Sequence, residues 1–148
     1  MRSEQSKAVI PHELLIFNLL IFNIGLPILA LLTHMERTLL PVAITCSLLI
    51  ILFIRIMSKR HHDTPFIKTH WKVVWRRCRI ILIAYSISLS IEMLSSFMAS
   101  FQTDPQLAKI MTIAFTRVAI VPTLLVVTPL LIMSTITTSR ILRGKIEA

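Results

Sequence analysis

Residues 58–79 read SKRHHDTPFIKTHWKVVWRRCR and form the one long interval of this chain that a lipid bilayer could not accept. Long apolar segments lie on both sides of this interval. Seven of its residues are basic, namely Lys59, Arg60, Lys68, Lys72, Arg76, Arg77 and Arg79. Loops rich in Lys and Arg stay on the cytoplasmic side of a membrane. The sequence therefore predicts a cytoplasmic loop over residues 58–79, from which the orientation of the other segments follows.

The composition indicates a protein that folds in lipid. Hydrophobic residues make up 55% of the 148 residues and the mean hydropathy is +0.77, which is too apolar for an ordinary soluble domain. The net charge of +9 would also fit a nucleic-acid-binding protein. However, the basic residues lie beside apolar runs and aromatic residues, as they do at a membrane interface. We therefore expect a lipid bilayer, and no nucleic acid, as the partner of these charges.

Four apolar segments are each close to the roughly 20 residues that a helix needs to cross the hydrocarbon. The predicted spans are residues 14–33, 38–57, 80–101 and 107–134. No small-residue cleavage site follows the first span, so we expect it to be retained, with a kink near Pro27. The sequence thus predicts one all-α integral membrane domain over residues 1–148.

The short connections between spans one and two and between spans three and four predict two antiparallel hairpins. With this arrangement, thirteen of the sixteen Lys and Arg residues lie on the cytoplasmic side. Arg37 and Lys109 lie outside, and Arg117 lies within the fourth span. This asymmetry predicts that both termini, like the loop, are cytoplasmic.

Two charged residues lie inside the predicted spans and require an explanation. Glu92 precedes the end of span three by nine residues, and Arg117 follows the start of span four by ten, so both lie roughly 14 to 15 Å below the outer surface. Because a charge in the membrane is costly, we predict an ion pair between them. Asn23 reaches a similar depth in span one and is expected to complete the hydrogen bonds, together with serines of span three. Ser88 and Ser96 belong to that small, polar face.

Three interpretations of this intramembrane network stay open. The pair can fix the register of the helices, or Glu92 can bind a transported proton, ion or polar solute, or the network can contact another membrane protein or a second copy of the chain.

The start of the third helix combines aromatic and basic residues. The candidates are His70, Trp71, Lys72, Trp75, Arg76 and Arg77. Such a segment can anchor the topology, attract anionic lipid headgroups or dock another protein. His12 and His70 are the only histidines placed to hold a haem between spans. The adjacent His61 and His62 do not form a metal-binding motif, and neither do Cys46 and Cys78. We expect no cofactor and no metal.

The segment TPFIKTHWKVVWRRCRIILIAY, residues 64–85, resembles the cytoplasmic loop and following helix of a group of small bacterial inner-membrane proteins. In that group a His beside an aromatic and a basic residue is followed by an Arg just before the span. The matching positions here are His70, Trp71, Lys72 and Arg76. The chain lacks the usual amide and Thr-Phe positions of the group, which has no settled activity. The resemblance implies a bacterial inner membrane and no particular mechanism.

The motifs of an enzyme are missing from the sequence. It contains no nucleophile with an orienting base, no paired carboxylates and no Gly-rich phosphate loop, since it has two glycines in all. The leading hypothesis is a non-catalytic membrane protein that acts through helix contacts and its basic loop, as an accessory, assembly or immunity-type partner. The alternatives are a small proton-linked or polar-solute transporter that uses Glu92, and a haem-binding redox subunit.

Overall fold

The computed structural model describes residues 2–60 and 64–144, and these residues form helices joined by short connections. The helices are α1 (Arg2–Phe17), the π-helix η1 (Asn18–Gly25), α2 (Leu26–Thr33), α3 (Glu36–Lys59), α4 (Pro65–Ser100) and α5 (Pro105–Leu142). Within the described residues, four helical stretches are long and apolar enough to cross a membrane: Glu4–Thr33, Glu36–Lys59, Pro65–Ser100 and Pro105–Leu142. The predicted all-α class and the four apolar helices are confirmed.

The first stretch is interrupted by η1, close to where a kink was predicted. Pro27 has no N–H, and its ring would clash with the carbonyl group of Asn23 in a regular α-helix. The wider turns of η1 end at Gly25, just before this proline. The side-chain amide of Asn23 donates to the carbonyl oxygen of Asn18 at 3.0 Å, which supplies that carbonyl with a partner inside η1. The backbone irregularity therefore precedes Pro27 and turns Asn23 toward the other helices.

The two short connections have recognisable helix caps. His34 ends α2 in the left-handed conformation, with φ of 54°, and its N–H bonds to the carbonyl oxygen of Ala30. Before α5, the Asp104 carboxylate accepts a 2.8 Å hydrogen bond from the backbone N–H of Gln106. Both connections are as short as predicted.

Most of the predicted loop over residues 58–79 is helical, which corrects the sequence interpretation. Pro65 opens α4, where its missing N–H costs nothing. Trp71, Val74 and Cys78 follow at helical spacing and are buried in the main core. The basic residues predict where a span leaves lipid, but a helix can continue beyond that point when one of its faces has a core to contact. The chain before the first predicted span is helical from Arg2 for the same reason, with Ala8 and Val9 buried.

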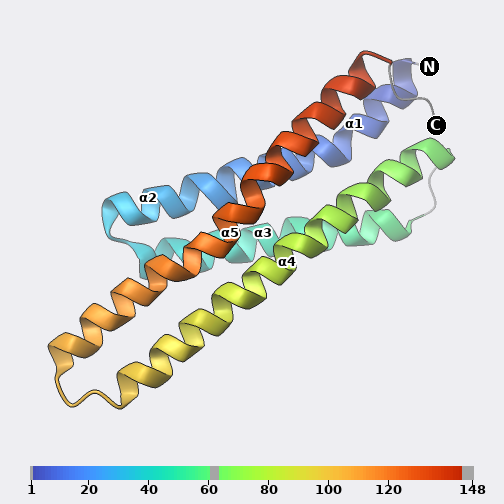
Figure 1. Cartoon of the computed structure of the whole chain (residues 1–148). Helices are drawn as coiled ribbons and strands as arrows, with labels where there is room; N and C mark the ends of the chain where they lie inside the picture. The colour runs from blue at the N-terminus through green and yellow to red at the C-terminus, as the bar shows by residue number, and fades with distance from the viewer. Residues whose placement is uncertain (1, 61–63, 145–148) are drawn as a thin grey trace.

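The helices α4 and α5 are longer than a bilayer requires. Their 36 and 38 residues correspond to about 54 and 57 Å, compared with a hydrocarbon thickness of roughly 30 Å. The predicted spans 80–101 and 107–134 therefore cover only part of each helix. Because α4 and α5 lie side by side over much of this length, they form the longest element of the molecule (Figure 1).

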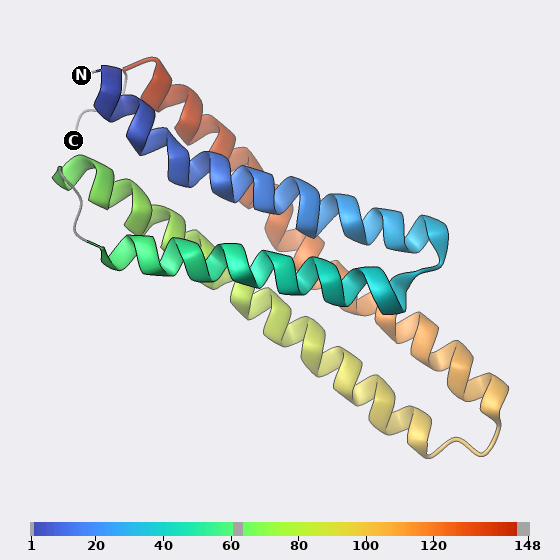
Figure 2. The same ribbon diagram turned by 180° about the vertical axis from the view of Figure 1, so that it is seen from behind.

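The helices converge at one end of the molecule and separate at the other. At the convergent end α1 packs on α4 and α5, close to the start of α4 and the end of α3 (Figure 1). The main core lies among these helices; it includes Leu15, Leu19, Ile51, Ile54, Trp71, Val74, Ile81, Val127 and Leu130. At the other end, the tip of α2 and α3 points away from the tip of α4 and α5, as Figure 2 also shows. This separation positions the site described next.

Candidate functional site

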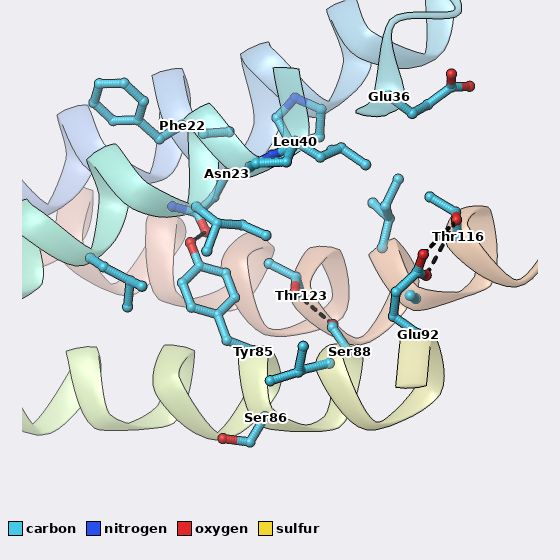
Figure 3. A pocket seen from close by; sticks show the side chains of 18 of the residues that line it. Phe22, Asn23, Glu36, Leu40, Tyr85, Ser86, Ser88, Glu92, Thr116 and Thr123 are labelled. Atoms are coloured by element: carbon cyan, nitrogen blue, oxygen red, sulfur yellow. Dashed lines mark hydrogen bonds between the residues drawn. The ribbon is translucent and has the colours of Figure 1, made fainter. Parts of the chain in front are cut away.

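A cavity of about 610 Å³ lies where α2 and α3 separate from α4 and α5. Its lining is mostly apolar and includes Phe22, Leu40, Ile44, Leu48, Leu89 and Ile120. Figure 3 shows that Tyr85, Ser88 and Glu92 project from α4 toward the helices opposite. Cavities of this size that combine apolar walls with a few polar groups are typical of small-molecule sites. We therefore take this cavity as the candidate functional site.

The end of the cavity nearest the core carries a closed set of polar contacts. Asn23, which is 1% exposed, donates from Nδ2 to Ser47 Oγ at 3.2 Å. Tyr85 Oη donates to Asn23 Oδ1 and lies 2.8 Å from Ser47 Oγ. Because a hydroxyl group both donates and accepts, the three side chains can satisfy one another. This set joins η1, α3 and α4 and fixes the position of the phenol.

Farther along the cavity, two contacts link α4 to α5. Ser88 Oγ lies 3.1 Å from Thr123 Oγ1. One turn on, the hydroxyl group of Thr116 lies 3.0 and 3.2 Å from the two carboxylate oxygens of Glu92 (Figure 3). A hydroxyl group has one hydrogen to donate, whereas a carboxylate can accept about four hydrogen bonds. Most of the hydrogen-bonding capacity of Glu92 is therefore still open to another group.

The predicted ion pair between Glu92 and Arg117 is wrong. Arg117 Nη2 instead lies 3.8 Å from Glu36 Oε1, at the start of α3. The pair was predicted from similar depths along the two spans, but depth does not define the direction in which a side chain points. Consecutive helical residues are rotated by about 100°, so when Thr116 faces α4, Arg117 faces elsewhere. Glu36 also lines the cavity, and its contact with Arg117 joins α3 to α5 there.

The other predicted members of the network separate into two groups. Asn23 and Ser88 line the cavity, as described above, but neither has a hydrogen bond to Glu92 within the described residues. Ser96 is exposed and donates to the backbone carbonyl oxygen of Glu92 at 3.1 Å, so its hydroxyl is satisfied within α4. The buried serine of this turn is Ser95. Of these two neighbouring serines, Ser95 therefore faces the other helices and Ser96 the surface.

A second polar cluster lies at the convergent end, outside the cavity. His12 Nε2 and His70 Nδ1 lie 3.1 Å apart, and both rings are buried. Arg77 approaches His12 Nδ1 at 3.4 Å and also donates to Ser134 and Thr137 of α5, at 3.1 and 3.0 Å. Because an arginine only donates, His12 Nδ1 must accept and Nε2 must carry the hydrogen. This cluster joins α1, α4 and α5.

The geometry of this pair does not favour the haem alternative. A haem iron between two histidines requires a free nitrogen on each ring, facing the iron from opposite sides. Here the facing nitrogens of His12 and His70 bond to each other, and the rings meet edge to face with centroids 5.3 Å apart. Within the described residues, there is also no group of three or more His, Cys, Asp or Glu side chains that could hold a metal ion.

The residues predicted to form one lipid-facing or partner-facing patch have different environments. His70 and Trp71 are buried, and Arg77 is partly buried. Lys72 and Arg76 are exposed. The ring of Trp75 packs against the Arg55 guanidinium at 5.6 Å, and the ring of Trp71 meets Phe53 edge to face. The patch is therefore divided between the core and the surface of α4, according to helical spacing.

Some cavity residues were not identified from the sequence. Ser47 was not predicted as a site residue, and neither was Thr116, which lies beside the charged Arg117. Tyr85 differs from these two, because helical spacing predicts it on the face of Glu92, seven residues or about two turns earlier in the helix. The partners of these residues come from helices distant in the sequence and could be identified only in the folded chain.

Comparison of the chain with protein-family models, with curated proteins and with solved structures gave no match. The resemblance of residues 64–85 to small bacterial inner-membrane proteins therefore stays a prediction. Any functional conclusion depends on the geometry of the chain itself.

Proposed function

We propose that this chain is a multi-pass membrane protein that binds a small solute in the cavity and carries it across the bilayer. The observation that supports this most directly is the carboxylate of Glu92. It lines a cavity of ligand size, and a single threonine hydroxyl is its hydrogen-bond partner among the described side chains. A carboxylate in this position suits a site whose charge is completed by a ligand or a proton.

The proposed orientation follows from the basic residues. The four helices form two hairpins, and both termini and the connection between α3 and α4 are cytoplasmic. The cavity then lies toward the outer side of the membrane. The cluster of His12, His70 and Arg77 lies on the cytoplasmic side, where close packing of α1, α4 and α5 separates the cavity from the cytoplasm. This arrangement corresponds to an outward-facing state of a carrier. A bacterial inner membrane is the proposed location.

The accessory or assembly function, which led the sequence-based hypotheses, has less support than the carrier. It would be favoured by the polar and small residues that are spread through all four spans, if these contacted a partner. Many of these side chains bond within the chain, for example Asn23 with Ser47 and Ser88 with Thr123. Several of the exposed serines and threonines donate to a backbone carbonyl group of their own helix; they include Ser86, Ser90, Ser96, Thr128 and Thr135. Such residues do not need a partner protein. That the chain is no enzyme also stays a prediction.

Uptake into proteoliposomes tests the proposal. The probes are three dyes that differ in charge: ethidium, Nile red and 8-anilinonaphthalene-1-sulfonate. We expect at least one dye to equilibrate several-fold faster than in protein-free liposomes, and Glu92→Gln to remove the difference. Glu13→Gln is the control, because Glu13 is an exposed carboxylate of α1 outside the cavity. If no dye crosses faster with the protein present, under a pH gradient of either direction, the carrier proposal is wrong.

A further inference from the structure

The charges of the cavity favour a cationic ligand. Three charged residues line it: Glu36, Arg37 and Glu92. Glu36 pairs with Arg117, and Arg37 is exposed in the first turn of α3. Within the described part of the chain, no basic side chain lies within salt-bridge distance of Glu92. Of the two carboxylates that line the cavity, Glu92 is therefore the one without an ion pair. An anionic ligand would be repelled by this group, whereas a cation would complete its coordination.

The walls of the cavity favour a ligand with a large apolar part. From Glu92 the lining continues two turns along α4, roughly 10 Å, to Tyr85. Apolar side chains of the other helices, among them Phe22, Leu40 and Ile120, also line the cavity. Two aromatic rings, those of Phe22 and Tyr85, are among the lining residues, and aromatic rings attract a cation that lies over the ring face. A ligand that fills this space therefore combines one positive charge near Glu92 with an apolar, preferably aromatic, body.

The residues at the edge of the cavity indicate how such a ligand enters. Ile44 and Leu48 of α3 and Leu89 of α4 line the cavity and are also 42, 40 and 62% exposed. In a membrane, exposed apolar side chains contact lipid acyl chains, so we place the entrance to the cavity on this bilayer-facing side, between α3 and α4. Molecules dissolved in lipid reach this opening directly, whereas strongly hydrated solutes do not.

We propose that the cavity binds a monovalent lipophilic cation, which enters from the bilayer between α3 and α4 and pairs with the Glu92 carboxylate. This inference rests on the proposed function and names the ligand class of the same site. The cation replaces water at the two carboxylate oxygens, while the hydroxyl group of Thr116 keeps them oriented. A lipid acyl chain is the competing occupant of the apolar walls, but it has no group that would pair with Glu92.

The test compares two probes of nearly the same shape and opposite charge, tetraphenylphosphonium and tetraphenylborate. Binding is measured by calorimetry in nanodiscs of phosphatidylcholine, with empty nanodiscs as the blank for partition into lipid. We expect tetraphenylphosphonium to bind at least about tenfold more tightly than tetraphenylborate. We also expect Glu92→Gln to weaken its binding at least about tenfold, with no change for Glu13→Gln. Glu92→Asp keeps the charge and is expected to retain most of the affinity.

The possible failures separate this inference from the proposed function. If tetraphenylborate binds as well as tetraphenylphosphonium, or if Glu92→Gln leaves cation binding unchanged in a variant that unfolds at the wild-type temperature, the ligand class is wrong although the cavity binds solutes. If neither ion binds above the blank, and mass spectrometry finds a phospholipid retained on the protein, the cavity is a lipid site and both proposals fail.

The route of entry has its own measurement. Leu48→Trp and Leu89→Trp each narrow the opening between α3 and α4. We expect both variants to slow the association of tetraphenylphosphonium several-fold. Leu125→Trp is the control and should leave the association rate unchanged, because Leu125 is 71% exposed on α5 and lies outside the cavity. Unchanged association in both narrowed variants would contradict entry from the bilayer.

Discussion

At the scale of single residues, two asparagines in η1 show why position alone does not define the role of a polar group. Asn18 and Asn23 are both buried, with exposed fractions of 0 and 1%. The amide of Asn23 bonds to Ser47, Tyr85 and a backbone carbonyl group. Among the described residues, Nδ2 and Oδ1 of Asn18 have no hydrogen-bond partner. A satisfied buried amide stabilises the fold, whereas an unsatisfied one carries a desolvation cost.

This difference leads to a prediction with a built-in control. Asn23→Leu should lower the free energy of unfolding by about 1–3 kcal/mol, because Ser47 and Tyr85 lose their common partner. Asn18→Leu makes the same change of side chain in the same helix and should leave stability unchanged or raise it. Reversible unfolding by SDS in mixed micelles, followed by circular dichroism, measures both. Equal losses in the two variants would contradict the hydrogen-bond assignment.

The sequence identified some residues of the site but not their contacts. Glu92, Asn23 and Ser88 were selected because polar groups within a span must face other helices, and all three line the cavity. The partner of Glu92 was predicted from depth alone. The depth of a residue follows from its number along the helix, but its contacts also depend on how the helix is rotated about its axis. Packing against distant parts of the chain defines that rotation. Glu36, which pairs with Arg117, was assigned to a connection and given no role.

At the scale of helices, the first half of α4 shows how one face of a basic segment becomes structural. Arg76 and Arg77 are neighbours, and the sequence treats them alike. In the folded chain Arg76 is exposed, while Arg77 is partly buried and donates to Ser134 and Thr137. The two acceptors lie three residues apart, on one face of α5. Arg77 therefore links α4 to α5 through two hydrogen bonds from one guanidinium group.

Substitution of these neighbours tests that link. Arg77→Met should lower the free energy of unfolding by about 1.5–3 kcal/mol, the range for hydrogen bonds of a charged group. Arg76→Met should change it by less than about 0.5 kcal/mol, because the side chain is on the surface. Arg77→Lys should give an intermediate loss, since an ammonium group does not reproduce the planar fork of donors. Similar losses at positions 76 and 77 would show that charge alone matters here.

At the scale of the whole molecule, the lengths of the helices limit how it can lie in a bilayer. The number of spans and the short connections were predictable because hydrophobicity and turn residues are local signals. The helical start of α4 was not, because it depends on burial against α1 and α3. With α4 and α5 longer than the hydrocarbon is thick, their ends must extend into the interfacial regions or into water. The proposed orientation puts their common tip outside and the basic start of α4 inside.

Labelling of single cysteines in intact cells tests this orientation. In a background with Cys46→Ser and Cys78→Ala, the variant Gln102→Cys is exposed between α4 and α5 and should react with a membrane-impermeant maleimide. Lys68→Cys, exposed near the start of α4, should react only after the membrane is permeabilised. Leu125→Cys, in the middle of α5, should be protected by lipid in both conditions. If position 68 reacts in intact cells and position 102 does not, the chain is inverted, the cavity faces the cytoplasm, and the proposed direction of transport must be reversed.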